Sequence, residues 1–182
     1  MNIIETNIEE LFIIEPVVFE DSRGAFFEIY NEKIFKKLGL KYEFVQDNQS
    51  FSYFGVIRGL HYQIEPHAQA KLVRAVVGTI LDVAVDLRED SDTFGQYFAV
   101  ELSDKNNRML MIPRGFAHGF SVLSEKAVVH YKCDNFYNKE AERGIIFNDP
   151  TLNIDWKIPV SQQLLSTKDL DYPNFEEAEK FD

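Results

Sequence analysis

The feature that most constrains this chain is a succession of short apolar segments separated by turn residues. The segments occupy residues 11–19, 25–30, 44–53, 56–63, 71–77, 80–87, 96–103, 108–113, 118–124 and 126–133. Turn-forming stretches such as DSRG (21–24) and DKNN (104–107) lie between them. This spacing predicts an all-β domain of the sandwich or jelly-roll type, because helices do not alternate with the strands.

The segment ILDVAVDL (80–87) shows the alternation of a strand with two different faces. Every second residue from Leu81 to Leu87 is leucine or valine, whereas Asp82 and Asp86 fall on the opposite face. That second face either meets solvent or lines the polar interior of a barrel.

Helical patterns are restricted to two short stretches. In NEKIFKKLG (31–39), Asn31 is a suitable N-cap, Ile34, Phe35 and Leu38 share one helical face, and Gly39 provides a stop. A second short helix is expected over residues 174–182. We expect residues 1–182 to form a single domain, with one or two short helices beside the strands.

Composition excludes several classes of protein. A formal net charge of −11 argues against general nucleic-acid binding, which needs a basic face. The only cysteine, Cys133, rules out an intramolecular disulfide and a cysteine-based zinc site. No apolar run approaches the length of a membrane span, and no basic segment precedes an apolar stretch at the N-terminus. We therefore expect a cytoplasmic protein without membrane contact.

The stretch GVIRGLHYQ (55–63) resembles the first metal-binding signature of the cupin fold. That signature has a glycine, then after five residues His-x-His, and later a Glu placed seven residues before a Gly. Gly55, His61 and Gly78 keep this spacing, but Gln63 replaces the second histidine and Lys71 replaces the carboxylate. An ammonium at this position would repel a metal cation.

A second cupin signature, P-x-G-x-x-H, is present as PRGFAH (113–118) and ends at His118. Of the expected metal ligands only His61 and His118 remain. The two signatures together, on a chain rich in predicted strands, predict a cupin-type double-stranded β-helix, or jelly roll, that binds no metal and needs no cofactor.

The residues left in this site suit proton transfer. Histidine is a common proton acceptor because imidazole titrates near neutral pH. Lys71 could stabilise a negative charge on oxygen as a metal would. His61 alone is better explained as a satisfied core histidine, but its company with Lys71 and Arg58 reverses this balance in favour of function. Because Arg58 and His61 are three residues apart in one strand, both can line a pocket only if the strand bulges, and Gly59 is the natural place.

Several longer motifs resemble the dTDP-4-dehydrorhamnose 3,5-epimerase family. They are FEDSRGAFFEIYN (19–31), RGLHYQ (58–63), QAKLVR (69–74), IPRGFAHGFSVLSE (112–125), YKCDNFY (131–137) and LSTKD (165–169). The resemblance extends from about residue 11 to about residue 173. It implies a metal-free jelly roll, a homodimer that exchanges N-terminal strands, and a dTDP-linked 4-keto-6-deoxy sugar as substrate. The implied reaction inverts C3 and C5 of dTDP-4-dehydro-6-deoxy-D-glucose and gives dTDP-4-dehydro-L-rhamnose.

The resemblance also implies roles for individual residues. His61 corresponds to the general base, Asp169 to the carboxylate that pairs with it, and Tyr131 to the acid that returns a proton from the opposite face of the sugar. Lys71 and Arg58 correspond to groups beside the C4 oxygen and the diphosphate. Further substrate-binding positions are Arg23, Phe26, Glu28, Gln46, Asn48, His118, Tyr137 and Lys168, with Phe26 and Tyr137 as aromatic walls for the thymine.

Structural roles are open for several of these residues. Asp169 could be a simple cap or turn residue, Tyr131 an aromatic wall, and Phe26 part of a core. A single-site epimerase, which inverts only C3 or only C5, would share the same motifs. A metal-dependent cupin and a non-catalytic sugar-nucleotide binding protein are more remote alternatives, which elemental analysis and the presence of base and acid would distinguish.

Overall fold

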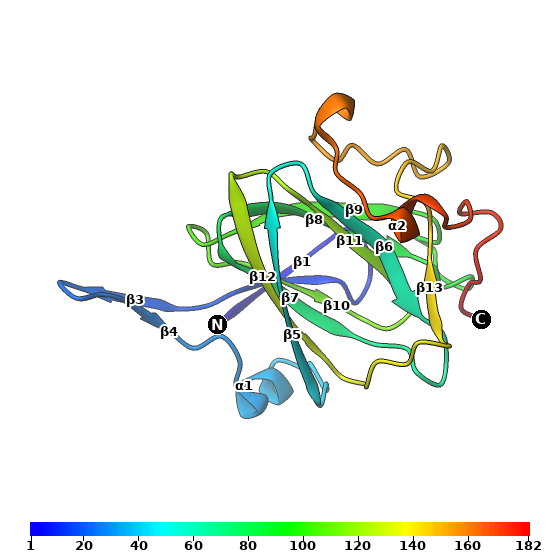
Figure 1. The fold of residues 1–182 in the computed structure, drawn as a ribbon. Coiled ribbons are helices and arrows are strands. Elements are labelled where there is room, and N and C mark those ends of the chain that lie inside the picture. Colours follow the sequence, from blue (N-terminus) through cyan, green and yellow to red (C-terminus); the bar gives the residue numbers. More distant parts are fainter.

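The computed structural model describes residues 1–182 as two antiparallel sheets that face each other, with a hairpin that projects from one side (Figure 1). The larger sheet has six strands in the order β1-β2-β10-β7-β12-β5, namely Asn2–Glu5, Phe12–Glu15, Met109–Ile112, Lys71–Val77, Lys126–Cys133 and Gln46–Tyr53. The smaller has five in the order β13-β6-β11-β8-β9, namely Glu142–Gly144, Ile57–Gln63, Phe116–Val122, Thr79–Asp86 and Tyr97–Ser103.

This arrangement confirms the all-β jelly-roll prediction. One expected segment, 11–19, divides at Pro16 into β2 and β3 (Val18–Asp21), which belong to different sheets. Strands β1 and β13 were not expected from the sequence. Each is short and alternates little, and each is held by pairing with a longer neighbour, β2 and β6 respectively.

Apolar side chains fill much of the space between the two sheets. Val73 and Leu110 from the six-stranded sheet meet Ala84, Leu102 and Phe120 from the five-stranded sheet in one buried cluster. Burial of such residues contributes roughly 25 cal/mol per Å² of apolar surface. This cluster gives the rest of the interior a rigid base on which polar groups can be placed.

The part of the chain that follows β13, which we call the C-terminal segment, covers the outer face of the five-stranded sheet (Figure 1). Val83 and Val85 of β8 pack there with Trp156 and Phe175. The opposite face of β8 therefore points inward, and the carboxylates that share it are completely buried. The polar face of segment 80–87 is thus part of the barrel interior and does not meet solvent.

Helix α1 (Glu32–Lys37) forms where the pattern predicts it. The Asn31 side chain accepts hydrogen bonds from the backbone N–H groups of Lys33 and Ile34, as an N-cap should. Phe35 is fully buried against the outer face of the six-stranded sheet. The helix therefore covers that sheet on the side opposite the barrel interior.

The helix predicted over residues 174–182 does not form, and this prediction was wrong. One helical hydrogen bond, from Ala178 N–H to the Asn174 carbonyl, is followed by an extended stretch in which Phe181 N–H donates to the Leu87 carbonyl. Phe175 and Ala178 are buried against the five-stranded sheet. Packing and pairing with the sheet thus outweigh the local helical preference. Two short helical segments instead lie earlier in the chain, the 3-10 helix η1 (Val160–Gln162) and the α-helix α2 (Thr167–Leu170).

Strands β3 (Val18–Asp21) and β4 (Gly24–Phe27) form a two-stranded arm that extends away from both sheets (Figure 1). The DSRG turn closes the arm, and Arg23 pairs there with Asp21. Phe19 and Phe26 remain 64% and 72% exposed. The arm therefore shows apolar surface that the chain itself does not cover.

No helix in the structure is long and apolar enough to span a lipid bilayer.

Candidate active site

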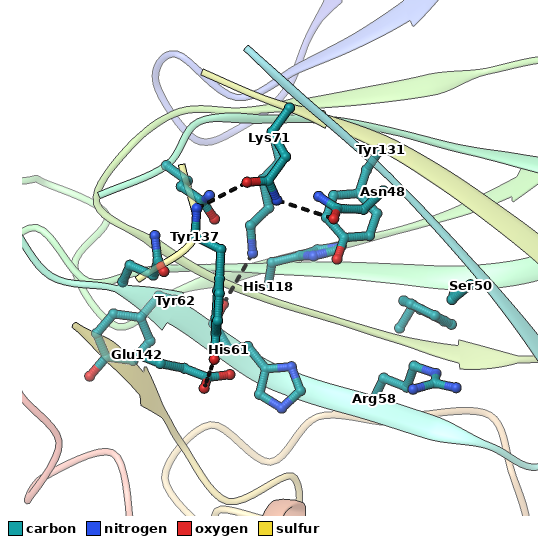
Figure 2. A pocket seen from close by; sticks show the side chains of 14 residues that line it. Asn48, Ser50, Arg58, His61, Tyr62, Lys71, His118, Tyr131, Tyr137 and Glu142 are labelled. Atoms are coloured by element: carbon teal, nitrogen blue, oxygen red, sulfur yellow. Dashed lines mark hydrogen bonds between the residues drawn. The ribbon is translucent and has the colours of Figure 1, made fainter. Parts of the chain in front are cut away.

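A cavity of about 380 Å³ opens between the two sheets beside the apolar interior (Figure 2). Its volume falls within the range that ligand sites usually have. The residues that line it are Gln46, Asn48, Ser50, Arg58, His61, Tyr62, Gln63, Gln69, Lys71, His118, Phe120, Tyr131, Tyr137 and Glu142. The cavity therefore gathers most of the residues that the sequence singled out.

Opposite walls of the cavity come from different sheets. His61 on β6 and His118 on β11 belong to the five-stranded sheet and are direct partners in its ladder. Lys71 on β7 and Tyr131 on β12 belong to the six-stranded sheet. A ligand in the cavity thus has an imidazole on one side and a phenol on the other.

His61 forms a close pair with Asp169, whose Oδ1 lies 2.5 Å from the imidazole Nε2. Burial works to raise the pKa of Asp169, but hydrogen bonds from His61 and Ser166 outweigh it and hold this pKa below its ordinary value. Asp169 is therefore a carboxylate at neutral pH. An ionised partner that bonds to one ring nitrogen fixes the orientation of the imidazole, which suits a general base.

The N-terminal end of helix α2 holds the Asp169 carboxylate in position. Ser166 is the N-cap of α2, and its Oγ accepts a hydrogen bond from Asp169 N–H. The same hydroxyl donates to Asp169 Oδ2 at 2.7 Å, so both carboxylate oxygens have a partner. The ring of Tyr172 packs edge-on against His61, with 5.6 Å between ring centroids. Asp169 is thus a helix residue and a histidine partner together.

Lys71 enters the cavity from the six-stranded sheet, and its ammonium lies 3.5 Å from the His61 carbonyl (Figure 2). Burial lowers the pKa of Lys71, while Cys133, Asp82 and Glu142 oppose this effect in part. No carboxylate forms an ion pair with the ammonium. It is therefore available to a negatively charged oxygen of a ligand.

Tyr131 is suited to hold a proton. Burial raises the pKa of its phenol, so the group is neutral near pH 7 and can donate. The neighbouring Cys133 is fully buried, and burial likewise raises the pKa of its thiol. The cysteine is thus a buried, unreactive thiol, and Tyr131 is the neutral phenol that lines the cavity.

A second histidine–aspartate pair lies deeper. His118 Nε2 is 2.8 Å from Asp82 Oδ1, and the carboxylate is fully buried. Burial lowers the pKa of His118, and the favourable field of Asp82 does not fully compensate. Asp82 Oδ2 has no hydrogen-bond partner. His118 is therefore a neutral side chain in the cavity floor.

The bulge expected at Gly59 is present. Along β11, His118 pairs with His61 and Phe120 with Arg58, so three steps on β6 match two on β11. Gly59 has a φ of 129°, and an added Cβ would lie 2.5 Å from the Cα of the facing glycine. The bulge turns Arg58 into the cavity, where its Nε donates to Ser52 Oγ at 3.1 Å.

Four further residues of the predicted substrate site lie in or beside the cavity. Gln46, Asn48 and Tyr137 line it directly. Lys168 forms an ion pair with Glu142, which lines the cavity and also accepts a hydrogen bond from the Tyr137 hydroxyl. Burial acts to raise the pKa of Glu142, but its hydrogen bonds from Lys168 and Tyr137 outweigh this and lower it.

Sequence reasoning missed some cavity residues. Glu142 lies in the short strand β13, whose sequence gives no strand signal, and it reaches the site because it pairs with Gln63. Gln69 stands in a loop. Gln63 was noted only as a lost metal ligand. The signal that could have found Gln63 and Gln69 is their place beside His61 and Lys71 in the quoted motifs.

Arg23, Phe26 and Glu28 are not brought to the cavity. Arg23 and Phe26 lie on the projecting arm, and Glu28 accepts a hydrogen bond from the Asn31 side chain at the start of α1. Within one chain these residues therefore do not line the site.

The donor set of the site does not resemble a metal centre. No group of three or more His, Cys, Asp or Glu side chains is placed so that it could hold a metal ion. Gln63 and Lys71 stand in the cavity together with His61 and His118, as the altered cupin spacing predicts.

Taken together, the fold and the site define a cupin-type jelly roll with an acid–base site. It has an oriented imidazole on one wall, a neutral phenol on the other and an ammonium beside them. Such a site suits removal and return of a proton at a carbon next to a carbonyl.

Comparisons with known proteins give the family. A sequence model described as dTDP-4-dehydrorhamnose 3,5-epimerase matches residues 5–177. The chain is 54% identical over 182 residues to a protein of that name from Shigella flexneri, which covers 100% of this chain and 99% of the relative. The chain belongs to the dTDP-4-dehydrorhamnose 3,5-epimerase family, as its motifs predicted, and is an isomerase.

Solved structures of the family share the fold closely. The enzyme from Elizabethkingia anophelis NUHP1 superposes with a TM-score of 0.94 at 57% identity, covering 97% of each chain. A structure from Legionella pneumophila Philadelphia 1, in complex with dTDP-4-keto-L-rhamnose, has a TM-score of 0.93 at 48% identity. It covers 97% of this chain and 93% of that chain.

Proposed function

We propose that the protein inverts C3 and C5 of dTDP-4-dehydro-6-deoxy-D-glucose to give dTDP-4-dehydro-L-rhamnose. One observation carries the proposal: the oriented imidazole of His61 and the neutral phenol of Tyr131 stand on walls from opposite sheets. Inversion at a carbon needs a base on one face and an acid on the other, because one group acting alone tends to restore the starting configuration. The family membership supplies the substrate class.

The first chemical step is assigned to His61. Its imidazole takes the proton from the carbon next to the C4 ketone, and the electron pair moves onto the ketone oxygen to form an enolate. Asp169 stabilises the imidazolium that results. Lys71 stabilises the enolate oxygen, and it is suited to this because no protein carboxylate pairs with it.

The second step is assigned to Tyr131. Its phenol gives a proton to the same carbon from the opposite face while the enolate returns to the ketone. Repetition at the second carbon, after both groups exchange protons with solvent, inverts the other centre. Arg58, Gln46, Asn48, His118 and Lys168 would contact the rest of the substrate, and Tyr137 would stack on the thymine.

The arm is assigned to a second copy of the chain. Arg23, Phe26 and Glu28 match substrate-binding positions, yet they lie outside the cavity of their own chain. In a homodimer that exchanges N-terminal strands, the arm of one protomer would complete the cavity of its partner. The exposed Phe19 and Phe26 support such a contact. A cytoplasmic location stays a prediction.

Complementation tests this assembly. Two inactive variants, His61→Asn and Arg23→Ala, should regain activity when they are mixed and allowed to exchange subunits, because one cavity of each mixed dimer is then intact. Activity that stays absent although mixed dimers form would contradict the exchange.

Solvent exchange tests the reaction itself. The protein is incubated in deuterium oxide with dTDP-4-dehydro-6-deoxy-D-glucose and a downstream reductase, and the product is examined by NMR. Deuterium is expected at C3 and C5, with proton couplings of the L-rhamno configuration. Deuterium at one carbon alone would show a single-site epimerase, and no incorporation would overturn the proposal.

A further inference from the structure

The short loop that carries Tyr137 is held by glutamine side chains, and we refer to residues 134–138 as the aromatic loop. Tyr137 itself is 54% exposed, so packing against a core does not fix its ring. Its hydroxyl donates to Glu142 Oε2 at 2.9 Å, which ties only the tip of the side chain. The position of the ring over the cavity therefore depends on the backbone of the loop.

Gln63 holds this backbone at two points. Its Nε2 donates to the carbonyl of Phe136 at 3.3 Å, and its Oε1 accepts from Asn138 N–H at 2.7 Å. The same Nε2 also donates to the carbonyl of His67 at 2.7 Å. Gln63 is only 5% exposed, so these bonds form away from water, where an unmade bond is costly.

Two further glutamines complete the set. Gln69 Nε2 donates to the Asn135 carbonyl at 2.8 Å, and Gln46 Oε1 accepts from Tyr137 N–H at 3.0 Å. Four consecutive residues of the aromatic loop, 135–138, are thus each bonded through a main-chain group to a glutamine side chain. The glutamines come from β5, β6 and the segment before β7, so the loop is tied to both sheets.

We propose that Gln63, at the position where a metal-binding cupin has its second histidine, is a positioning residue that sets affinity for the nucleobase end of the substrate by fixing Tyr137. This inference rests on the proposed function, because it takes Tyr137 as the wall for the thymine. The position that holds a metal-binding histidine in another cupin thus carries a glutamine that organises a binding loop here. A glutamine suits the task because it offers a donor and an acceptor together, whereas a carboxylate offers only acceptors.

The test uses Gln63→Met, which keeps the size of the side chain and removes every hydrogen bond. Affinity for dTDP is measured by calorimetry, and kcat and KM are measured with the 4-keto sugar nucleotide. We expect Kd and KM to rise about tenfold, because both buried hydrogen bonds from Gln63 to the loop are lost, with kcat within about twofold. Gln162→Met, at an exposed glutamine outside the cavity, is the matched control and should change neither constant.

A double-mutant cycle with Tyr137→Ala shows whether Gln63 acts through the tyrosine. In that background Gln63→Met should weaken dTDP binding less than about twofold. The same tenfold loss in both backgrounds, or a fall in kcat with Kd unchanged, would overturn the proposal. If Gln63→Met does not fold, Gln69→Met serves instead, with an expected loss of about threefold because one bond is removed. If the unmodified protein binds dTDP but the effects of Gln63→Met and Tyr137→Ala are additive, only the positioning role is refuted. If the unmodified protein does not bind dTDP, the proposed function is refuted.

Discussion

The two histidine–aspartate pairs of the cavity contain the same residue types and differ in their surroundings. His61 is 33% exposed and lies 2.5 Å from Asp169, while His118 is 7% exposed and lies 2.8 Å from Asp82. Asp169 has a second partner in Ser166, whereas the second oxygen of Asp82 has none. Burial and the second hydrogen bond thus differ between the pairs, and under the proposed mechanism they would distinguish the reactive pair from the supporting one.

The origin of each carboxylate explains the difference. Asp82 belongs to the central part of β8, where the strand fixes its position and keeps water away. Asp169 comes from a short helix in the C-terminal segment, which approaches β6 from outside the barrel (Figure 1). The pair of His61 and Asp169 can therefore meet a substrate and exchange a proton. The pair of His118 and Asp82 would instead maintain the shape and charge of the cavity floor.

Exchange of each histidine for asparagine should give the largest contrast. We expect His61→Asn to lower kcat by about 10³-fold, because general base catalysis contributes roughly 10²–10⁴. His118→Asn should lower it by about tenfold, since a neutral hydrogen-bonding side chain remains in the floor. Steady-state rates measure both effects, and circular dichroism checks the fold. Equal losses for the two variants would remove the distinction between the pairs.

Lys71 lines the same cavity as both histidines, and Lys71→Met should lower the activity while it raises the stability. Loss of the ammonium should lower kcat by about 10²-fold, as removal of a group that stabilises an oxyanion does. Burial lowers the pKa of Lys71, so its charge is held in the fold at a cost, and the variant should be more stable by about 1 kcal/mol. Thermal unfolding with and without dTDP measures this effect. A variant that is both active and less stable would contradict the assignment.

The sequence predicted the parts of this comparison that depend on local pattern. Strand positions follow from apolar alternation, and the altered cupin spacing places His61, Lys71 and His118 in one cavity because strands of a barrel keep their register. The bulge at Gly59 follows from the need to turn two side chains to one side.

Other parts depend on contacts that no short window contains. Asp169 is 108 residues from His61 in the chain, so the residues alone favour a cap or turn residue. The structure shows that Asp169 bonds both to the cap residue Ser166 and to His61. Residues 174–182 have a helical pattern, yet they form no helix, because Phe175 and Phe181 pack against the apolar outer face of the five-stranded sheet. Glu142 reaches the cavity only through the pairing of β13 with β6.

The buried pair should also dominate the response of stability to acid. Since burial lowers the pKa of His118 below that of an unfolded histidine, the unfolded chain binds the proton first. Stability is therefore expected to fall as the pH decreases below about 6.5, and His118→Asn should flatten this fall. Unfolding in urea between pH 5 and 7.5 measures it. His130→Asn, at a half-buried histidine outside the cavity, is the control and should change the slope less.

The smallest expected effect concerns the feature that the buried pair lacks, the hydroxyl of Ser166. Ser166→Ala removes the bond to Asp169 Oδ2, so we expect kcat to fall about threefold to tenfold as the carboxylate loses its fixed orientation. Because the pKa of Asp169 is held below its ordinary value, the bond stabilises the fold above the pKa of an unfolded aspartate. Its contribution, about 1 kcal/mol, should disappear as the pH falls through the lowered pKa of the folded protein. Ser166→Thr keeps the hydroxyl and should restore both rate and stability. If Ser166→Ala instead lowers stability equally at every pH with kcat unchanged, the serine is only a helix cap, and His61 with Asp169 suffices as the reactive pair.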